Sequence, residues 1–429
     1  MNKAGIYLSI PFCRQKCTYC NFASDVHPAS LLPRYLDCLA EEITVRIALW
    51  EKAGIPASDV PVDSIYMGGG TPGLLSGEQL GHLLEAVRAS FAVEGQHSSA
   101  PPRHPKRRGV FGGPRLRSRL GSATEITIEA SPENVTPESA AAWAECGINR
   151  VSLGVQSMVR EELRAVARMH DAETVAQAFS SLRAAGIENI SADLIAGLPN
   201  QTAGSWQASL RGLLGLNPAH LSIYMLEVDE DSRLGRAILE DGARYHAAEV
   251  PSEEEITKFY CTAMETLRNA GFEHYEISNF SLPGRRSRHN EKYWLDAPYY
   301  GFGVDAHSYD GHRRWATTDS LIRYLEMVER REPPVVELRA LGSQEKLEER
   351  FFLGLRRREG VSIARLSAEF AAKEGVTAPS QRELWEKYAK PIREFREAEW
   401  LETEGDRLRL TDRGLLVSNE VFAGFLEGN

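Results

Sequence analysis

The chain has 429 residues and a formal net charge of −10. At about 100–200 residues per domain, this length predicts two or three domains. No apolar run approaches the roughly 18 residues that a membrane-spanning helix needs, and the N-terminus lacks the apolar region of a signal peptide, so we expect a cytoplasmic protein whose membrane contact is at most peripheral. The negative charge argues against a nucleic-acid partner.

Three cysteines follow the first apolar stretch of the chain. Residues 5–10 have the pattern of a short strand, and Cys13, Cys17 and Cys20 come directly after it with the spacing C-x3-C-x2-C. Thiolates this close together suit one compact inorganic centre. A [4Fe–4S] cluster normally takes four cysteine ligands, so three cysteines leave one iron open to a ligand that reacts.

Other uses of these cysteines agree less well with the sequence. A disulfide would leave one cysteine over. A zinc site needs a fourth ligand, for which His27 is available, but zinc loops usually come as two knuckles and this chain has one. Covalent haem attachment requires a histidine directly after the motif, where Asn21 follows Cys20. An iron–sulfur cluster is favoured, and a zinc-stabilised binding module without redox chemistry stays open as an alternative.

The first half of the chain alternates strand-like apolar runs with amphipathic helical patterns, which is typical of β-α units around a parallel sheet. Helices are predicted over residues 137–146, where a proline occupies the first position, and 172–186. Strands are predicted at residues 5–10, 63–67, 125–129, 150–155, 190–195 and 220–226. Six such units predict an α/β fold with a partial (β/α)6 barrel over residues 1–235.

Polar residues stand at the predicted strand ends. The second strand runs into residues 66–72 (YMGGGTP), and the later ones end at Glu129, Gln156, Asp193 and Glu227. Three consecutive glycines allow a ligand to lie against bare backbone. The stretch is neither a Walker loop nor a dinucleotide fingerprint. Because the carboxyl ends of parallel strands meet at one edge, we expect these groups to surround a single opening.

Residues 95–122 differ in composition from the rest of the barrel region. They hold seven Lys/Arg, several prolines and glycines, and no acidic residue. Such a segment has no apolar face to bury. We interpret it as a basic, disordered surface insertion, and binding of RNA or of an acidic partner is the alternative.

After about residue 235 the pattern changes. Residues 236–340 predict a linking region with a helix over 253–270, and they contain a His-Asn-x-x-Tyr-Trp motif formed by His289, Asn290, Tyr293 and Trp294. Flat rings beside imidazoles, among them His307 and His312, suit stacking on a macrocycle and ligation of its metal. Packing of the same rings at a domain junction is equally consistent with the sequence.

Residues 341–429 predict a smaller, mostly helical C-terminal domain. A hairpin over residues 400–410, followed by a last helix, gives the order of elements in a winged helix. From residue 381 onward acidic residues outnumber basic ones, so we do not expect this domain to bind DNA.

The cysteine loop and residues 68–72 (GGGTP) together resemble the radical S-adenosylmethionine (SAM) superfamily. More narrowly, the chain is similar to the branch that contains oxygen-independent coproporphyrinogen III dehydrogenase, also called an oxidase, and the HemW-type heme chaperones. The supporting stretches are residues 128–132 (IEASP), 151–156 (VSLGVQ), 168–170 (RMH), 193–199 (DLIAGLP) and 289–294 (HNEKYW). The resemblance spans nearly the whole chain except residues 95–122.

The resemblance implies a cofactor set. Cys13, Cys17 and Cys20 would ligate three irons of a [4Fe–4S] cluster, and the fourth iron would chelate SAM. With an electron donor, the cluster would break the sulfonium C–S bond and give a 5′-deoxyadenosyl radical. By position, the family's SAM-contacting residues correspond to Tyr7, Gly69, Gly70, Thr71, Glu129, Gln156, Arg168 and Asp193.

Within the branch, three features imply a heme chaperone rather than the dehydrogenase. The dehydrogenases carry a further cysteine two residues after the last ligand, where this chain has Phe22. They also have an N-terminal arm before the first strand, whereas here the strand begins at Gly5. The His-Asn-x-x-Tyr-Trp motif is typical of the chaperones. We therefore expect heme binding, with His289, Asn290, Tyr293 and Trp294 as candidates, and delivery of heme to an unidentified acceptor protein. The dehydrogenase is the alternative.

Overall fold

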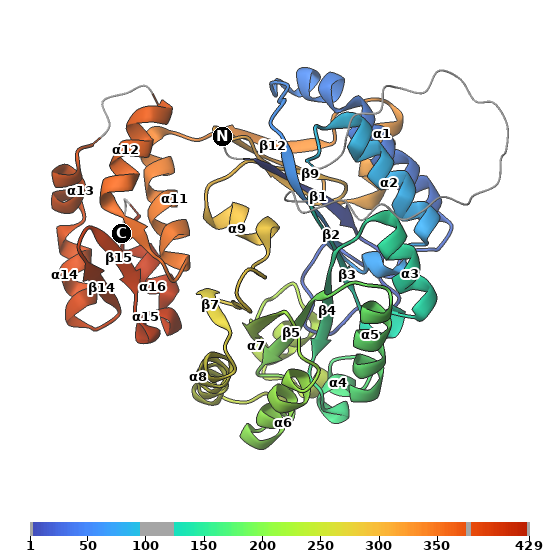
Figure 1. Cartoon of the computed structure of the whole chain (residues 1–429), viewed down its shortest axis with the longest axis horizontal. Helices are drawn as coiled ribbons and strands as arrows, with labels where there is room; N and C mark the ends of the chain where they lie inside the picture. Colours follow the sequence, from blue (N-terminus) through green and yellow to red (C-terminus); the bar gives the residue numbers. More distant parts are fainter. Residues whose placement is uncertain (1–2, 95–123, 375–378, 427–429) are drawn as a thin grey trace.

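The computed structural model describes residues 3–94, 124–374 and 379–426. Its first half consists of six parallel strands joined by helices, as predicted (Figure 1). In chain order these elements are β1 (Ala4–Ile10), α1 (Leu31–Ala53), β2 (Val62–Gly69), α2 (Gly77–Ser90), β3 (Glu125–Ala130), α3 (Pro137–Cys146), β4 (Arg150–Gln156), α4 (Arg160–Ala165), α5 (Ala172–Ala184), β5 (Asn189–Ala196), α6 (Ala203–Leu214) and β6 (His220–Met225). Short 3-10 turns follow β2 (Pro72–Leu74) and β3 (Pro132–Asn134).

Local sequence explains where the barrel helices begin and end. Helix α3 starts at Thr136, whose side chain accepts from the Ser139 N–H, and the helix ends at Gly147 with φ 93°. Helix α5 starts at Asp171, which accepts from the Thr174 N–H. Such caps satisfy the free amide groups of the first turn, and glycine adopts the left-handed end without strain. The strands between them are buried on both faces, as expected of a parallel sheet covered by helices.

The sheet continues beyond the six barrel strands. Its order is β12-β11-β10-β9-β1-β2-β3-β4-β5-β6-β8-β7. The added strands are β7 (Glu273–Glu276), β8 (Asn279–Ser281), β9 (Tyr299–Phe302), β10 (His307–Tyr309), β11 (Arg313–Thr317) and β12 (Val335–Ala340). They come from the region that the sequence predicted as a link, and the division of the chain at residues 235 and 340 stays a prediction. Strand β9 pairs with β1 in parallel, and β8 pairs with β6 antiparallel.

The helical elements of this region are α7 (Arg233–Leu239), a 3-10 segment (Arg244–Glu249), α8 (Glu253–Asn269), α9 (Arg288–Trp294) and α10 (Leu321–Glu329). The C-terminal part, orange to red in Figure 1, comprises α11 (Ser343–Arg356), β13 (Val361–Ser362), α12 (Ile363–Glu374), α13 (Gln381–Lys387), α14 (Ala389–Glu397), β14 (Leu401–Glu404), β15 (Arg407–Leu410), α15 (Asp412–Leu416) and α16 (Ser418–Ala423). The predicted hairpin is β14–β15, and β13 completes a three-stranded sheet. Ion pairs join this part to the rest, among them Arg350–Asp296 at 3.0 Å and Arg286–Glu359 at 2.7 Å.

The predicted basic insertion at residues 95–122 lies outside the described residues. Among the helices of the described ranges, none combines the length and the apolar character needed to cross a bilayer.

The turn between β9 and β10 is fixed to helix α1. The Gly303 N–H donates to Glu42 Oε2 at 2.9 Å, and the Val304 N–H donates to the Tyr35 hydroxyl at 3.2 Å. Gly303 has φ 95°, and a Cβ there would stand 2.3 Å from the Tyr35 hydroxyl and 2.8 Å from the Ser9 carbonyl oxygen. Only glycine therefore fits this position, for steric as well as conformational reasons.

We predict that Gly303→Ala destabilises the protein much more than Gly311→Ala does. Gly311 has φ 96°, and a Cβ added there would meet no atom within 4 Å, so both variants carry the strain of a left-handed alanine but only the first adds a clash. The strain costs about 1–2 kcal/mol in each, and the clash adds a further ~1–3 kcal/mol at Gly303. Denaturant unfolding of both variants measures the difference, and equal losses would show that Tyr35 moves aside without cost.

Candidate functional site

The cysteine loop lies at the carboxyl end of β1. The Cys13 N–H donates to the Asp25 carbonyl at 3.0 Å, and the Thr18 N–H donates to the Val166 carbonyl at 3.4 Å. The thiols of Cys13, Cys17 and Cys20 are free and half-buried. Burial raises the pKa of Cys13 and of Cys20 above the ordinary thiol value. The loop is thus tied to its own downstream segment and to the end of α4, and none of its three thiols is in a disulfide.

The glycine turn after β2 lies against this loop. The Gly70 N–H donates to the Ile10 carbonyl at 2.8 Å and the Thr71 N–H donates to the Phe12 carbonyl at 2.9 Å. The Thr71 hydroxyl reaches the Cys13 sulfur at 3.8 Å. A Cβ on Gly70 would stand 2.7 Å from the Phe12 carbonyl oxygen, and Gly69 has φ 105°. The two loops therefore form one surface in which no larger residue can replace Gly70.

Glu129 faces the glycine turn from the end of β3. Its carboxylate accepts from the Tyr66 hydroxyl at 2.7 Å, and a Cβ on Gly68 would lie 3.1 Å from its oxygens. Burial raises the pKa of Glu129 to about 7, and the hydrogen bonds from Tyr66 and from the Gly69 N–H oppose that rise. Tyr7 stacks on Tyr66 with ring centroids 6.1 Å apart.

Gln156 ends β4, and Arg168 lies in the loop after α4 with its guanidinium beside Gly154 of β4. The ladder between β4 and β5 shifts register between Gly154 and Gln156, and Gln156 has φ 65°, a bulge of the kind that re-aims a side chain. Arg168 donates to Ser131 Oγ at 2.8 Å and to the Tyr19 hydroxyl at 3.4 Å. In the described ranges, Gln156 Oε1 and Arg168 Nε are buried without a hydrogen-bond partner. Buried polar atoms without a partner are uncommon and call for an explanation.

Asp193 lies in the middle of β5 rather than at its end, where the sequence had placed it. The Ser152 hydroxyl donates to its carboxylate at 3.4 Å, and burial raises the pKa of this carboxyl. The positive charge of Arg168 opposes this rise in the pKa of Asp193, and Arg168 also interacts electrostatically with Cys17. Asp193 therefore belongs to the same group of side chains as Arg168 and the cysteine loop. Glu227, expected at the end of the sixth strand, is exposed beyond the end of β6.

Supporting residues escaped the sequence analysis. Tyr66, Tyr19, Ser131 and Ser152 hold Glu129, Arg168 and Asp193 in place, yet a lone tyrosine or serine in a strand or loop has no spacing that marks it. The available signals were the position of Tyr19 between two of the cysteines and of Tyr66 within residues 66–72.

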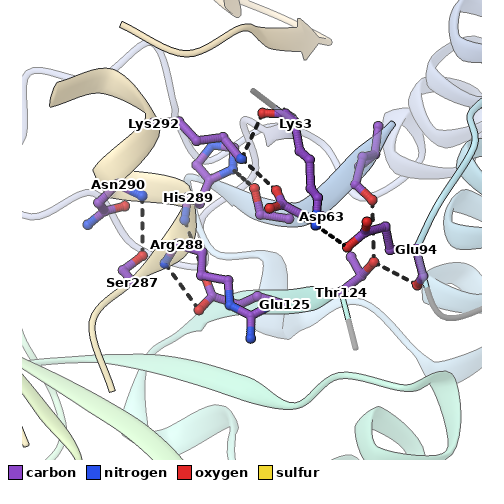
Figure 2. Close-up of polar contacts among 12 residues, drawn as sticks. Lys3, Asp63, Glu94, Thr124, Glu125, Ser287, Arg288, His289, Asn290 and Lys292 are labelled. Carbon is purple, nitrogen blue, oxygen red and sulfur yellow. Dashed lines mark hydrogen bonds and ion pairs between the residues drawn. The ribbon is translucent and has the colours of Figure 1, made fainter. Parts of the chain in front are cut away.

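The His-Asn-x-x-Tyr-Trp motif forms α9, and Figure 2 shows how it attaches to the barrel. Glu125, at the start of β3, accepts from the backbone N–H of Arg288 at 3.2 Å and of His289 at 3.3 Å. Lys292 Nζ lies 2.5 Å from the Asp63 carboxylate near the start of β2 and donates to the Lys3 carbonyl at 3.0 Å. Helix α9 thus closes the barrel at the amino ends of β1–β3, opposite the cysteine loop.

His289 is buried inside this closure. It is 1% exposed, its Nδ1 lies 3.2 Å from Ser64 Oγ and its Nε2 lies 3.0 Å from the Tyr293 hydroxyl. Burial lowers the pKa of His289 to about 3, so the ring is neutral. Because both ring nitrogens are engaged, these contacts favour the packing role over ligation of iron, although ligation stays a prediction. The Arg356 guanidinium lies over the Trp294 ring, with its central carbon 4.3 Å from the ring centroid. This pair is part of the contact between α9 and the C-terminal part.

Asn290 belongs to the first turn of α9, where its N–H donates to Ser287 Oγ at 3.3 Å. The remaining member of the motif is Tyr293. It lines a cavity of ≈ 410 Å³. The lining of this cavity is Tyr7, Ser9, Pro11, Phe22, Ala23, Ser24, Gly69, Tyr293, Tyr299, Val304, Asp305 and His307. A wider groove of ≈ 1120 Å³, between α14 and β14, contains none of the predicted site residues.

The raised pKa of Glu129 predicts a pH-dependent stability. A buried carboxyl with pKa about 7 against an ordinary 4.5 binds more protons in the folded state, so stability falls as pH rises through this window. In the wild type, the free energy of unfolding should fall by on the order of 2 kcal/mol between about pH 4.5 and 7 because of this group. We predict that Glu129→Gln removes this fall. Thermal midpoints across this range measure it.

The control for this experiment is Glu254→Gln. Glu254 is exposed, and the hydrogen bond from Lys258 lowers the pKa of its carboxyl. Its effect on the free energy of unfolding therefore changes below the pH range of this experiment. The control should keep the wild-type slope. A Glu129→Gln profile parallel to wild type would contradict the prediction.

Comparison with known proteins identifies the family. The profile of the radical SAM superfamily matches residues 7–212, and that of the HemN C-terminal domain matches residues 341–417. The chain is 31% identical to the heme chaperone HemW of Bacillus subtilis over 98% of both chains, and 30% identical to that of Lactococcus lactis over 98% of this chain and 96% of the relative. The solved coproporphyrinogen III oxidase HemN of Escherichia coli has the same fold, with a TM-score of 0.79, 20% identity, and coverage of 99% of this chain and 90% of that one. The chain belongs to the HemW family of the radical SAM superfamily.

Proposed function

We propose that this protein is a heme chaperone, which holds a [4Fe–4S] cluster and SAM, binds heme and transfers it to an acceptor protein. The observation that carries the proposal is the cavity beside the cysteine loop, whose walls include Tyr7, Phe22, Tyr293 and Tyr299. Flat aromatic walls suit a flat macrocycle. The name of the relatives, heme chaperone HemW, agrees with this chemistry.

The donors of the cysteine loop fit an iron–sulfur cluster. Cys13, Cys17 and Cys20 offer three free thiols on one loop, and the Thr71 hydroxyl adds a hydrogen bond to a sulfur. Hydrogen bonds of this kind tune such centres. In the described ranges no group of three His, Cys, Asp or Glu side chains has the spacing of a metal site as the side chains stand. Cluster and SAM, when bound with an electron donor, supply radical chemistry.

The residues around the loop suit the groups of SAM. The carboxylates of Glu129 and Asp193 accept from hydroxyls such as those of a ribose, and the Arg168 guanidinium suits a carboxylate. The unpaired Gln156 Oε1 offers a further hydrogen bond, and Gly69 and Gly70 allow the turn after β2 to lie directly against the cysteine loop. Tyr7 and Thr71 complete the proposed set.

Two alternative functions can be distinguished from that of a heme chaperone. The dehydrogenase is supported by the shared fold with HemN, which at 20% identity concerns the fold alone. The position two residues after Cys20 argues against it, because the exposed Phe22 stands where the dehydrogenases carry a cysteine. A zinc-stabilised binding module would use the same thiols without redox chemistry.

We predict that Cys17→Ala abolishes the full cluster. Removing one of three thiolate ligands leaves too few donors, so reconstituted iron should fall well below about four per chain. Iron analysis and the visible spectrum after anaerobic reconstitution measure this. Cys261→Ala on α8 removes another half-buried thiol and should retain the cluster. Four irons retained in Cys17→Ala, or zinc alone in the wild type, would contradict the assignment.

Binding tests separate chaperone from dehydrogenase. We predict that the reconstituted protein binds heme, seen as a shifted Soret band, and does not consume coproporphyrinogen III in the presence of SAM and a reductant. The physical reason is the missing cysteine at Phe22. Turnover of coproporphyrinogen without heme binding would establish the dehydrogenase instead.

A further inference from the structure

We infer that His307, rather than His289, is the protein's ligand to heme iron, in the cavity between the β9–β10 turn and the cysteine loop. This inference rests on the proposed function, namely that the protein binds heme.

His307 lies at the same end of the barrel as the cysteine loop. Strand β9 pairs with β1 in parallel, from Gly5↔Tyr299 to Leu8↔Phe302, so both strands run toward the same edge of the sheet. The turn after Phe302 leads directly into β10, which begins with His307. His307 then lines the cavity that Phe22 and Ser24 of the cysteine loop close from the other side. His289 lies toward the closed end and does not line the cavity, although its ring centroid is 6.2 Å from that of Tyr7, which does.

The ring of His307 is available to a metal. Its side chain is 66% exposed, and Asp305 Oδ1 lies 3.9 Å from Nε2, beyond a hydrogen bond. Across the described ranges, no hydrogen bond engages either ring nitrogen, in contrast to the two that hold His289. A carboxylate beside a ligating imidazole fixes its tautomer and raises its basicity. Asp305 can take that role with one ring nitrogen while the other faces the iron.

The cavity has the walls that a macrocycle requires. Tyr293 and Tyr299 meet edge to face with centroids 4.6 Å apart. Phe22 is 65% exposed, so it can cover a ring that enters. The volume of ≈ 410 Å³ lies within the range of about 300–1,000 Å³ typical of ligand pockets. A heme seated here stays partly exposed, as transfer to an acceptor demands.

The support of His307 is rigid. The turn before it is held by Glu42 and Tyr35 through the amides of Gly303 and Val304. Thr317 adds two bonds, accepting from the Ala306 N–H at 2.8 Å and donating to the Gly303 carbonyl. A ligand on such a support keeps its geometry before heme arrives.

Heme titration of the reconstituted full chain tests the inference. His307→Ala should weaken heme affinity by at least about tenfold and move the Soret band. His82→Ala, which removes an exposed histidine from α2, and His289→Ala should keep the wild-type band position. In His307→Gly, added imidazole should restore the wild-type band, which a merely structural role of His307 would not produce. The change that SAM induces in the cluster spectrum should persist in all variants.

The outcomes separate this inference from the proposed function. Wild-type protein that binds no heme refutes the proposed function. Wild-type binding with unchanged affinity and Soret band in His307→Ala overturns the assignment of His307 alone. A shifted band in His289→Ala, with none in His307→Ala, returns the role to the motif histidine.

Discussion

Strand β1 is the constraint on which the whole site depends. It pairs in parallel with β2 on one side and with β9 on the other, and Tyr7 stands opposite Tyr66 in one ladder and Gly301 in the other. Parallel pairing gives the three strands one direction. The cysteine loop, the glycine turn and the turn before His307 therefore leave the sheet at one edge. A slip by one residue would exchange the two faces of β1 and separate these loops from the polar side chains inside.

The barrel interior holds charges that stability alone does not favour. Burial raises the pKa of Glu129 to about 7 and the pKa of Asp193 above its ordinary value, while the buried Arg150 opposes both shifts. Burying carboxylates is costly unless they are paired. We propose that a ligand completes the hydrogen bonding here, because these carboxyls share this end of the barrel with half-buried thiols and an unpaired Gln156 oxygen.

The sequence predicted what is encoded locally and missed what depends on distant pairing. The proline at the start of residues 137–146 and the apolar periodicity of residues 172–186 located two of the barrel helices, α3 and α5, and apolar runs located the six strands. Strands β7–β12 are short and partly polar, and β9 exists because β1 offers it a free edge. The thiols and the polar strand ends could be predicted from spacing. The depth of Asp193 in its strand could not, because register is set by packing.

The contacts that the structure gives the His-Asn-x-x-Tyr-Trp motif are packing contacts, and its role in heme ligation stays a prediction. His289 fills the closed end of the barrel, where α9 is tied to Glu125 and Asp63. Breaking a buried ion pair such as Lys292–Asp63 costs on the order of 3–5 kcal/mol, so the closure is a strong constraint on sequence. Yet His289 holds the Tyr293 hydroxyl, and Tyr293 lines the cavity at the open end. We therefore propose that the motif acts on the cavity through Tyr293, as a positioning element, and that the exposed turn after β9 carries the group that meets the ligand.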